Sequence, residues 1–419
     1  MNRHLILALT CGIALPLALV ACSSPSTTDQ APHAHAAPAD DSPGHGEITG
    51  ATEEAEPQLK LLTVDDTGAV GLLDLLDGGE RTLDPIPVPA RLSTDGRYVF
   101  GDSGAGLSVT DSGAWTWDHG DHFHFYSAEP TQLGIVPGDG AARVTGGPLS
   151  TAGATGVFFA GSGEAVLLDN TALAAGTLTE RFRVAVTPHF GILAPIGDGA
   201  VVSEAIAGSD GTQLRVLDDA GGASDTTAPC DAPRGATSTR AGLVVLCAGG
   251  AVVGTDDGGS VALSPAPLPN GASAAPAALD GRKGRPTLAG PGVTADGEHG
   301  VWLFEVRARA WTWIPSSAPL AAAAAVGDDA GHIVAVDTAG RVVVFRGSDE
   351  VAATAPLLTG EDLTDAGLER VSLTVDANRT YLNAPASGVV YEIDVADGAR
   401  IARELQPAVA PVFVAEVGR

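Results

Sequence analysis

The chain has 419 residues, enough to bury a large core in one β-architecture or in about two or three average domains. Its formal net charge of −28 excludes a nucleic-acid binder, because such proteins need clustered cations to displace counterions. Its 54 glycines and 28 prolines, with only 5% aromatic residues, predict many turns and short strands rather than long helices.

The first segment, residues 1–21, is predicted to be a lipoprotein signal peptide. Arg3 precedes an apolar run from Leu5 to Val20, which is short for a permanent membrane span. The run ends in Leu-Val-Ala-Cys at residues 19–22, which resembles the bacterial lipobox. We therefore expect Cys22 to carry a lipid that anchors an extracytoplasmic protein to the cell membrane. An ordinary cleaved secretion signal is the alternative.

Residues 22–57 predict a disordered tether. The segment consists mainly of Ser, Pro, Ala, Asp and Glu, with almost no apolar residue to anchor a core. It nevertheless carries His33, His35 and His45, a residue type that linkers do not normally accumulate. These histidines suit a secondary metal site on a mobile arm; ordinary linker drift is the alternative.

Residues 58–419 repeat one pattern, a short apolar strand, an Asp/Gly turn and a second apolar strand, as in 61–73, 243–253 and 332–345. Such units recur about every 30 to 60 residues, the length of a propeller blade. We expect an all-β chain folded as a β-propeller of eight blades, with seven blades as the alternative. Two sandwiches or a solenoid fit less well, because no linker divides the body. The sequence Ala-Trp-Thr-Trp occurs at 114–117 and at 310–313, which predicts the same strand in two blades.

Three of the chain's ten histidines and two aspartates lie within residues 118–126, Asp-His-Gly-Asp-His-Phe-His-Phe-Tyr. Because side chains alternate along a strand, His122 and His124 should face one side, with His119 and Asp121 close by. Neutral imidazoles with nearby carboxylates suit a zinc-sized cation. The stretch therefore predicts a metal site; a strand end with solvated histidines is the alternative.

A further candidate ligand is His189, which follows Pro188 and precedes an apolar run typical of a blade's innermost strand. The start of such a strand lies near the propeller axis, so His189 is predicted as a third nitrogen ligand. A hydrogen-bonded structural histidine is the alternative. His299 and His332 have no clustered partner and are predicted to be ordinary polar residues.

The cysteines divide by position. Cys11 is expected to be removed with the signal peptide, and Cys22 to carry the lipid. Cys230 and Cys247 then remain in the body. Two remaining thiols in an exported protein predict a disulfide.

Catalytic patterns are weak. The Gly-Ser turns lack the strand-to-helix elbow of an esterase nucleophile, and no phosphate-binding Gly-rich loop precedes a helix. We therefore expect a protein that is not an enzyme. A propeller hydrolase or lactonase is the least favoured alternative, since such metal sites usually use oxygen ligands around calcium.

The chain resembles the AztD-type zinc metallochaperones, exported β-propellers that accompany a zinc ABC importer. The resemblance covers nearly the whole body, and its specific part is the stretch at residues 118–126. Its weaker parts are residues 187–191, the Cys230 and Cys247 pair, 381–383, 390–394 and 418–419.

This resemblance implies that His119, His122, His124 and His189 handle Zn²⁺ and that the protein delivers it to the importer's solute-binding protein. One departure is Arg234, which stands where the family pattern has a histidine after the first body cysteine, so one ligand is expected to be missing. The competing class is a non-metal propeller that binds a protein or polysaccharide at the cell surface. Zinc, copper and nickel stay open as the metal for these nitrogens, since affinity order alone favours copper.

Overall fold

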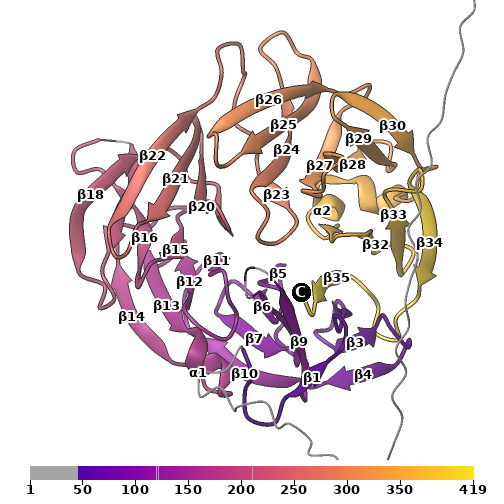
Figure 1. Ribbon diagram of the computed structural model, residues 1–419, viewed down its shortest axis with the longest axis horizontal. Helices are drawn as coiled ribbons and strands as arrows, with labels where there is room; N and C mark the ends of the chain where they lie inside the picture. Colours follow the sequence, from indigo (N-terminus) through magenta and orange to yellow (C-terminus); the bar gives the residue numbers. More distant parts are fainter. Residues whose placement is uncertain (1–45, 119, 121, 210) are drawn as a thin grey trace, which may run out of the picture. The chain divides into compact units, whose positions relative to one another are not determined.

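The computed structural model describes residues 46–118, 120, 122–209 and 211–419. In this part of the chain, β-strands arranged as a ring of sheets dominate (Figure 1), so the predicted all-β propeller fold is confirmed. The described helical segments are short, namely α1 (Asn170–Ala174), the 3-10 turn η1 (Gly360–Leu363) and α2 (Asp365–Leu368).

Most described sheets have four antiparallel strands, one at the centre of the ring and the others following outward (Figure 1). Among the described residues these sheets are β5 (Arg91–Thr94), β6 (Tyr98–Asp102), β7 (Leu107–Asp111) and β10 (Thr131–Val136); β11 (Ala142–Gly146), β12 (Ala154–Phe159), β13 (Glu164–Asp169) and β14 (Glu180–Ala185); β15 (Leu193–Ile196), β16 (Gly199–Ala205), β17 (Thr212–Leu217) and β18 (Ala223–Pro229); β19 (Gly235–Thr239), β20 (Gly242–Cys247), β21 (Gly250–Asp256) and β22 (Val261–Pro267); and β31 (Leu373–Val375), β32 (Arg379–Ala384), β33 (Val389–Asp394) and β34 (Arg400–Leu405).

One larger sheet joins two such sets. It contains β23 (Asp280–Gly281), β24 (Thr287–Val293), β25 (His299–Glu305), β26 (Ala310–Pro315), β27 (Leu320–Ala325), β28 (His332–Asp337), β29 (Val342–Arg346) and β30 (Asp349–Ala353). The short strand β23 pairs in parallel with β27 and so connects the two halves. Because this sheet is continuous, the number of blades stays a prediction.

The ring is closed by pairing strands from the two ends of the described chain. The sheet β35–β2–β3–β4 places β35 (Phe413–Val417) beside β2 (Lys60–Val64), followed by β3 (Val70–Asp74) and β4 (Glu80–Leu83). Gly418 follows β35 with φ +96°, and a Cβ there would lie 2.1 Å from the Gln58 carbonyl oxygen. Only glycine fits this close approach without strain.

The hydrophobic core lies between the faces of neighbouring sheets. For example, Val334 and Val344 of β28 and β29 share one buried cluster with Leu382 and Ile393 of β32 and β33. Strands buried on both faces have continuous apolar runs, which is why the sequence pattern of these inner strands is apolar rather than alternating. Burial of these side chains fixes the sheets relative to one another.

The N-terminal boundary differs from the prediction. Residues 46–57 were expected to belong to the disordered tether, but β1 (Thr52–Glu54) pairs antiparallel with β9 (Phe123–Ser127). The Trp115 indole nitrogen also donates to the Gly46 carbonyl at 3.0 Å. The tether boundary at residue 57 is therefore wrong, because edge-strand pairing orders a segment that is polar in sequence. Residues 1–45, with the signal segment and Cys22, lie outside the described residues.

The predicted disulfide between Cys230 and Cys247 is present, with a Cα–Cα distance of 5.2 Å. It links the residue after β18 to the last residue of β20 and so ties two neighbouring sheets together.

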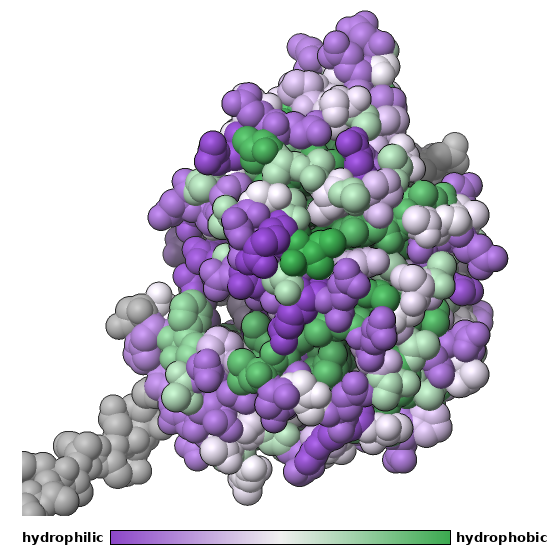
Figure 2. Space-filling view, turned by 90° about the vertical axis from the view of Figure 1, so that its right-hand side faces the viewer, coloured by the Kyte–Doolittle hydropathy of each residue, from purple (hydrophilic) through white to green (hydrophobic). Residues whose placement is uncertain are grey.

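No described helix has the length and hydropathy needed to cross a membrane. The side of the body in Figure 2 mixes hydrophilic residues with small hydrophobic groups.

Glu416 is a buried acid in the closing strand β35, where it pairs with Leu61 and is 1% exposed. Burial raises the pKa of Glu416 from 4.5 to about 7, and Arg419, 3.3 Å away, opposes this only in part. Ionising this carboxyl costs free energy in the folded state but not in the unfolded state. The free energy of unfolding is therefore highest while Glu416 is protonated in both states, and part of it is lost as the pH rises from about 4.5 to about 7.

Replacing Glu416 with Gln should flatten this pH dependence. Across that window we expect the wild type to lose stability on the order of 3 kcal/mol relative to Glu416→Gln. Melting temperatures at about pH 5 and about pH 8 measure the difference. Glu404→Gln on β34 is the control, because that side chain is exposed. An equal pH response of the wild type and both variants would contradict the assignment.

Candidate metal site

The histidine-bearing stretch lies in a hairpin that is inserted in the sequence between two strands of the sheet β5–β6–β7–β10. Strands β8 (Ala114–Asp118) and β9 are inserted between β7 and β10, and β1 extends the hairpin to a three-stranded sheet. At its base Trp115 stacks on Tyr126 with ring centroids 5.3 Å apart, and the Arg97 guanidinium lies 3.9 Å from the Trp115 ring centroid. A buried ion pair with Asp111, at 2.7 Å, fixes Arg97. The hairpin base is therefore rigidly positioned.

The far end of the hairpin is held by residues from distant parts of the ring. The Asp118 carboxylate pairs with the Arg240 guanidinium, which lies between β19 and β20. The Thr116 hydroxyl donates to the Gly418 carbonyl at 2.8 Å. The hairpin thus connects the sheet from which it leaves to the sheet beginning with β19 and to the ring closure.

The two faces of β9 differ, as the alternation in the sequence predicts. Phe123 and Phe125 line a cavity of about 520 Å³ together with Arg240, Lys283 and other residues. His124 lies on the other face, where its ring is 4.8 Å from that of His122 and 6.4 Å from that of Tyr126, centroid to centroid. One strand therefore separates a cavity lined by two phenylalanines from a pair of imidazoles.

The imidazole pair has a geometry suited to a metal ion. The Nε2 atoms of His122 and His124 are 3.0 Å apart. A tetrahedral zinc ion with Zn–N bonds of about 2.0–2.1 Å would separate its nitrogen ligands by about 3.3–3.4 Å. A movement of a few tenths of an ångström is within the reach of side-chain rotation. The pair can therefore supply two of the nitrogen ligands of such an ion.

Glu53 is a further candidate residue of this site, and sequence reasoning missed it. Its Oε1 lies 2.7 Å from His124 Nδ1. Because a carboxylate only accepts hydrogen bonds, this contact places a proton on Nδ1 and leaves the Nε2 lone pair of a neutral His124 directed toward His122. A carboxylate behind a ligating histidine is the usual arrangement in metal sites. Nothing in the sequence near Glu53 indicates this role, since β1 pairs across 71 residues.

The environment of His189 is described by its hydrogen bonds and one aromatic contact. Its Nδ1 lies 2.8 Å from the Thr187 carbonyl oxygen, and its Nε2 lies 2.8 Å from the Ser203 hydroxyl. Its ring contacts Phe158 edge-on at 4.9 Å. Both ring nitrogens thus have protein partners, and the role of His189 as a ligand stays a prediction.

The remaining predicted ligands lie where the structure gives no description, namely His119, Asp121, His33, His35 and His45. Within the described ranges, no three or more His, Cys, Asp and Glu side chains are grouped closely enough to hold a metal ion. The described part of the site is therefore the His122–His124 pair with Glu53.

Arg234, which replaces an expected histidine, lines a central cavity. Its guanidinium donates to the carbonyl oxygens of Ala275 and Pro276, the latter at 2.8 Å.

The two Ala-Trp-Thr-Trp tetrads lie in strands of different kinds. The first lies in the inserted hairpin and the second in β26, at the end of its four-strand set, so the prediction that they are equivalent strands is wrong.

Comparison with known proteins supports the fold. No family model matches the chain, and no curated protein matches it. Among solved structures it is similar to AztD from Citrobacter koseri, with a TM-score of 0.70 and 21% identity over 86% of this chain and 98% of that one. The structure of apo AztD from the same organism matches with a TM-score of 0.69 and 20% identity over the same shares. The chain therefore has an AztD-type β-propeller fold.

The contact between Glu53 and His124 predicts a tautomer that NMR can measure. In the metal-free protein at a pH where the ring is neutral, His124 should carry its proton on Nδ1, and Glu53→Ala should shift population toward the Nε2 tautomer. Imidazole nitrogen shifts report this. His332, whose Nδ1 lies 2.6 Å from Asp328, is the internal control and should not change. An unchanged His124 spectrum in Glu53→Ala would contradict the assignment.

Proposed function

We propose that this AztD-type propeller binds Zn²⁺ as cargo outside the cytoplasm and passes it to the solute-binding protein of a zinc ABC importer. The observation that carries the proposal is the imidazole pair, with Nε2 atoms 3.0 Å apart and Glu53 behind one ring. Nitrogen donors supported by a carboxylate favour zinc over the hard cations calcium and magnesium. The resemblance of residues 118–126 to AztD-type zinc metallochaperones supports the same cargo.

Two ligands do not complete a tetrahedral site, so further donors are needed. The candidates are His119 and Asp121, which adjoin the pair in sequence, and His189. Ligation through the His189 Nε2 requires the loss of its 2.8 Å contact with Ser203. We propose His119 or Asp121 as the next donor, because both adjoin the pair in the sequence, whereas both ring nitrogens of His189 already have protein partners.

The position of the N-terminal segment supports a transfer role. Gly46 packs so closely on the Trp117 indole that a Cβ would lie 2.5 Å from it. Trp117 is the cross-strand neighbour of His124. Because His45 precedes Gly46 directly in the sequence, we propose that the histidines of the arm exchange the ion with the pair.

The mechanism we propose is stepwise ligand exchange. The arm histidines capture the ion, the hairpin histidines hold it, and ligands of the partner replace them one at a time. His122 is exposed, so a partner can approach its ring directly. Cys22 would hold the protein at the membrane surface near an importer. No covalent chemistry is needed, and we propose that the protein is not an enzyme.

Calorimetry on the metal-free protein tests the proposal. Zinc should bind the wild type at a tight site, and His122→Ala with His124→Ala should abolish that site. Glu53→Gln should weaken binding about 10- to 100-fold, because the carboxylate orients His124. His299→Ala is the matched control, since this histidine lies on β25, away from the hairpin. Cu²⁺ and Ni²⁺ titrations measure selectivity.

A wild type without a tight zinc site, or a site that survives the double substitution, would contradict the proposal. Melting temperatures provide a second measurement, because a ligand that binds only the folded state raises them with its concentration. A protein indifferent to metal would belong to the competing class of propellers that bind a protein or polysaccharide at the cell surface.

A further inference from the structure

The centre of the ring contains a cavity whose charge is opposite to that of the chain. The cavity has a volume of about 220 Å³, and its ionisable lining residues are Arg91, Arg143, Arg234 and Asp280. Three arginines thus stand against one aspartate, although the whole chain has a net charge of −28. Arg91 lies on β5 and Arg143 on β11, both innermost strands.

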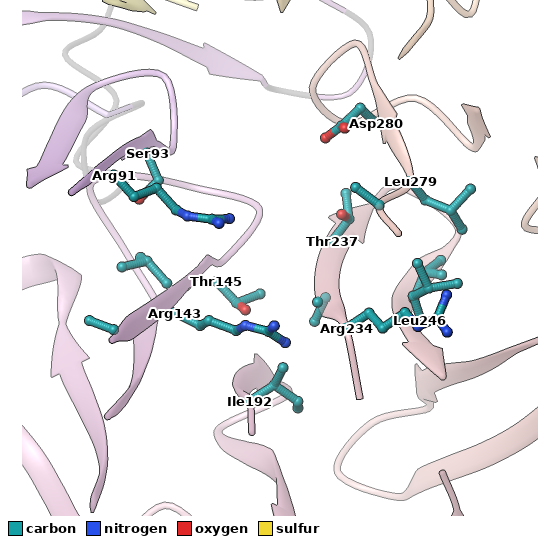
Figure 3. Close-up of a pocket in the computed structure, with 16 residues that line it drawn as sticks. Arg91, Ser93, Arg143, Thr145, Ile192, Arg234, Thr237, Leu246, Leu279 and Asp280 are labelled. Atoms are coloured by element: carbon teal, nitrogen blue, oxygen red, sulfur yellow. The ribbon is translucent and has the colours of Figure 1, made fainter. Parts of the chain in front are cut away.

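The arginines around this cavity have no acidic partners among the described residues, in contrast to many other arginines of the body. Figure 3 shows the side chains of Arg91 and Arg143 extending into the same space from one wall. Burial lowers the pKa of Arg143, and the positive charge of Arg91 lowers it further. Two guanidinium groups are therefore close enough to repel each other.

The orientation of the second arginine is fixed by the backbone. Arg143 Nη1 donates to the Pro233 carbonyl at 2.8 Å, which leaves its other N–H groups available. On the opposite wall Arg234 is held by the carbonyls of Ala275 and Pro276. Arg234 therefore contributes positive charge from a fixed position, whereas Arg91 donates no side-chain hydrogen bond within the described part of the chain.

We propose that this cavity binds a small multivalent oxyanion between Arg91 and Arg143. Planar guanidinium groups bind carboxylate and phosphate oxygens in a bidentate manner, and such charge-assisted hydrogen bonds are stronger than neutral ones. The hydroxyls of Ser93 and Thr237, which also line the cavity, can donate to the same oxygens. The volume of about 220 Å³ fits an anion of the size of phosphate or a short di- or tricarboxylate and is small for larger ligands.

An anion would relieve the repulsion between the two arginines. Arg143 is partly buried, where an unpaired charge is costly, and a bound counter-charge lowers that cost. The carboxyl of Asp280 is the opposing charge on the wall. Binding should therefore favour anions with two or more charges, which outcompete both chloride and this carboxylate.

The test uses the full-length protein in a phosphate-free buffer. Phosphate, sulfate, succinate and citrate are titrated separately at constant ionic strength, with sodium chloride as the reference, by calorimetry and by melting temperature. At least one anion should bind at one site per chain and raise the melting temperature with its concentration. The four anions distinguish a tetrahedral oxyanion from a carboxylate ligand.

Arg91→Gln and Arg143→Gln should each weaken that affinity about tenfold or more, because each loses charge-assisted hydrogen bonds. Arg346→Gln is the matched control, since Arg346 is exposed on β29 and has no ion pair among the described residues. If Arg143→Gln does not fold, Arg91→Gln alone decides the question. Stabilisation no greater than that by chloride, or unchanged affinity in Arg91→Gln, would overturn the proposal.

Discussion

The pairing of β35 with β2 is the constraint on which the rest of the molecule depends. Because a propeller has no covalent link between its first and last sheets, this antiparallel ladder is what closes the ring and removes two open sheet edges. It also brings the last residues into the middle of the ring. There the Gly418 carbonyl accepts from Thr116, and the Arg419 backbone oxygen accepts from Lys283 at 3.0 Å.

The hairpin that carries the imidazoles is positioned by this closure. Its base rests on the buried Arg97–Asp111 ion pair, and its far end contacts Gly418 and Arg240. With both ends fixed, the alternation of β9 separates two chemistries over a single strand. The phenylalanines face a cavity, while the histidines face the segment that contains Glu53 and Gly46. A loop of the same sequence without these anchors would not hold two nitrogens at metal-binding separation.

The electrostatics of the interior differ from those of the whole chain. Net charge describes solubility and long-range attraction, whereas a local site depends on the few groups that surround it. Aspartates at turns account for many of the acidic residues, because their carboxylates accept backbone N–H bonds there, as Asp65 and Asp337 do. The inner strands instead contribute arginines to the central cavity. An acidic protein can therefore contain a cationic centre.

The sequence by itself determined the strand-turn-strand repeat, the all-β propeller, the disulfide and the two faces of residues 122–126, because each follows from local alternation, turn chemistry or a small count of cysteines. Only the tertiary structure decided that Glu53 supports His124, that residues 52–54 pair with β9, and that His189 is bonded to Thr187 and Ser203. It also decided that the two Trp tetrads occupy unlike strands. These features depend on pairing between segments far apart in the chain, and the period of a single strand contains no information about its distant partners.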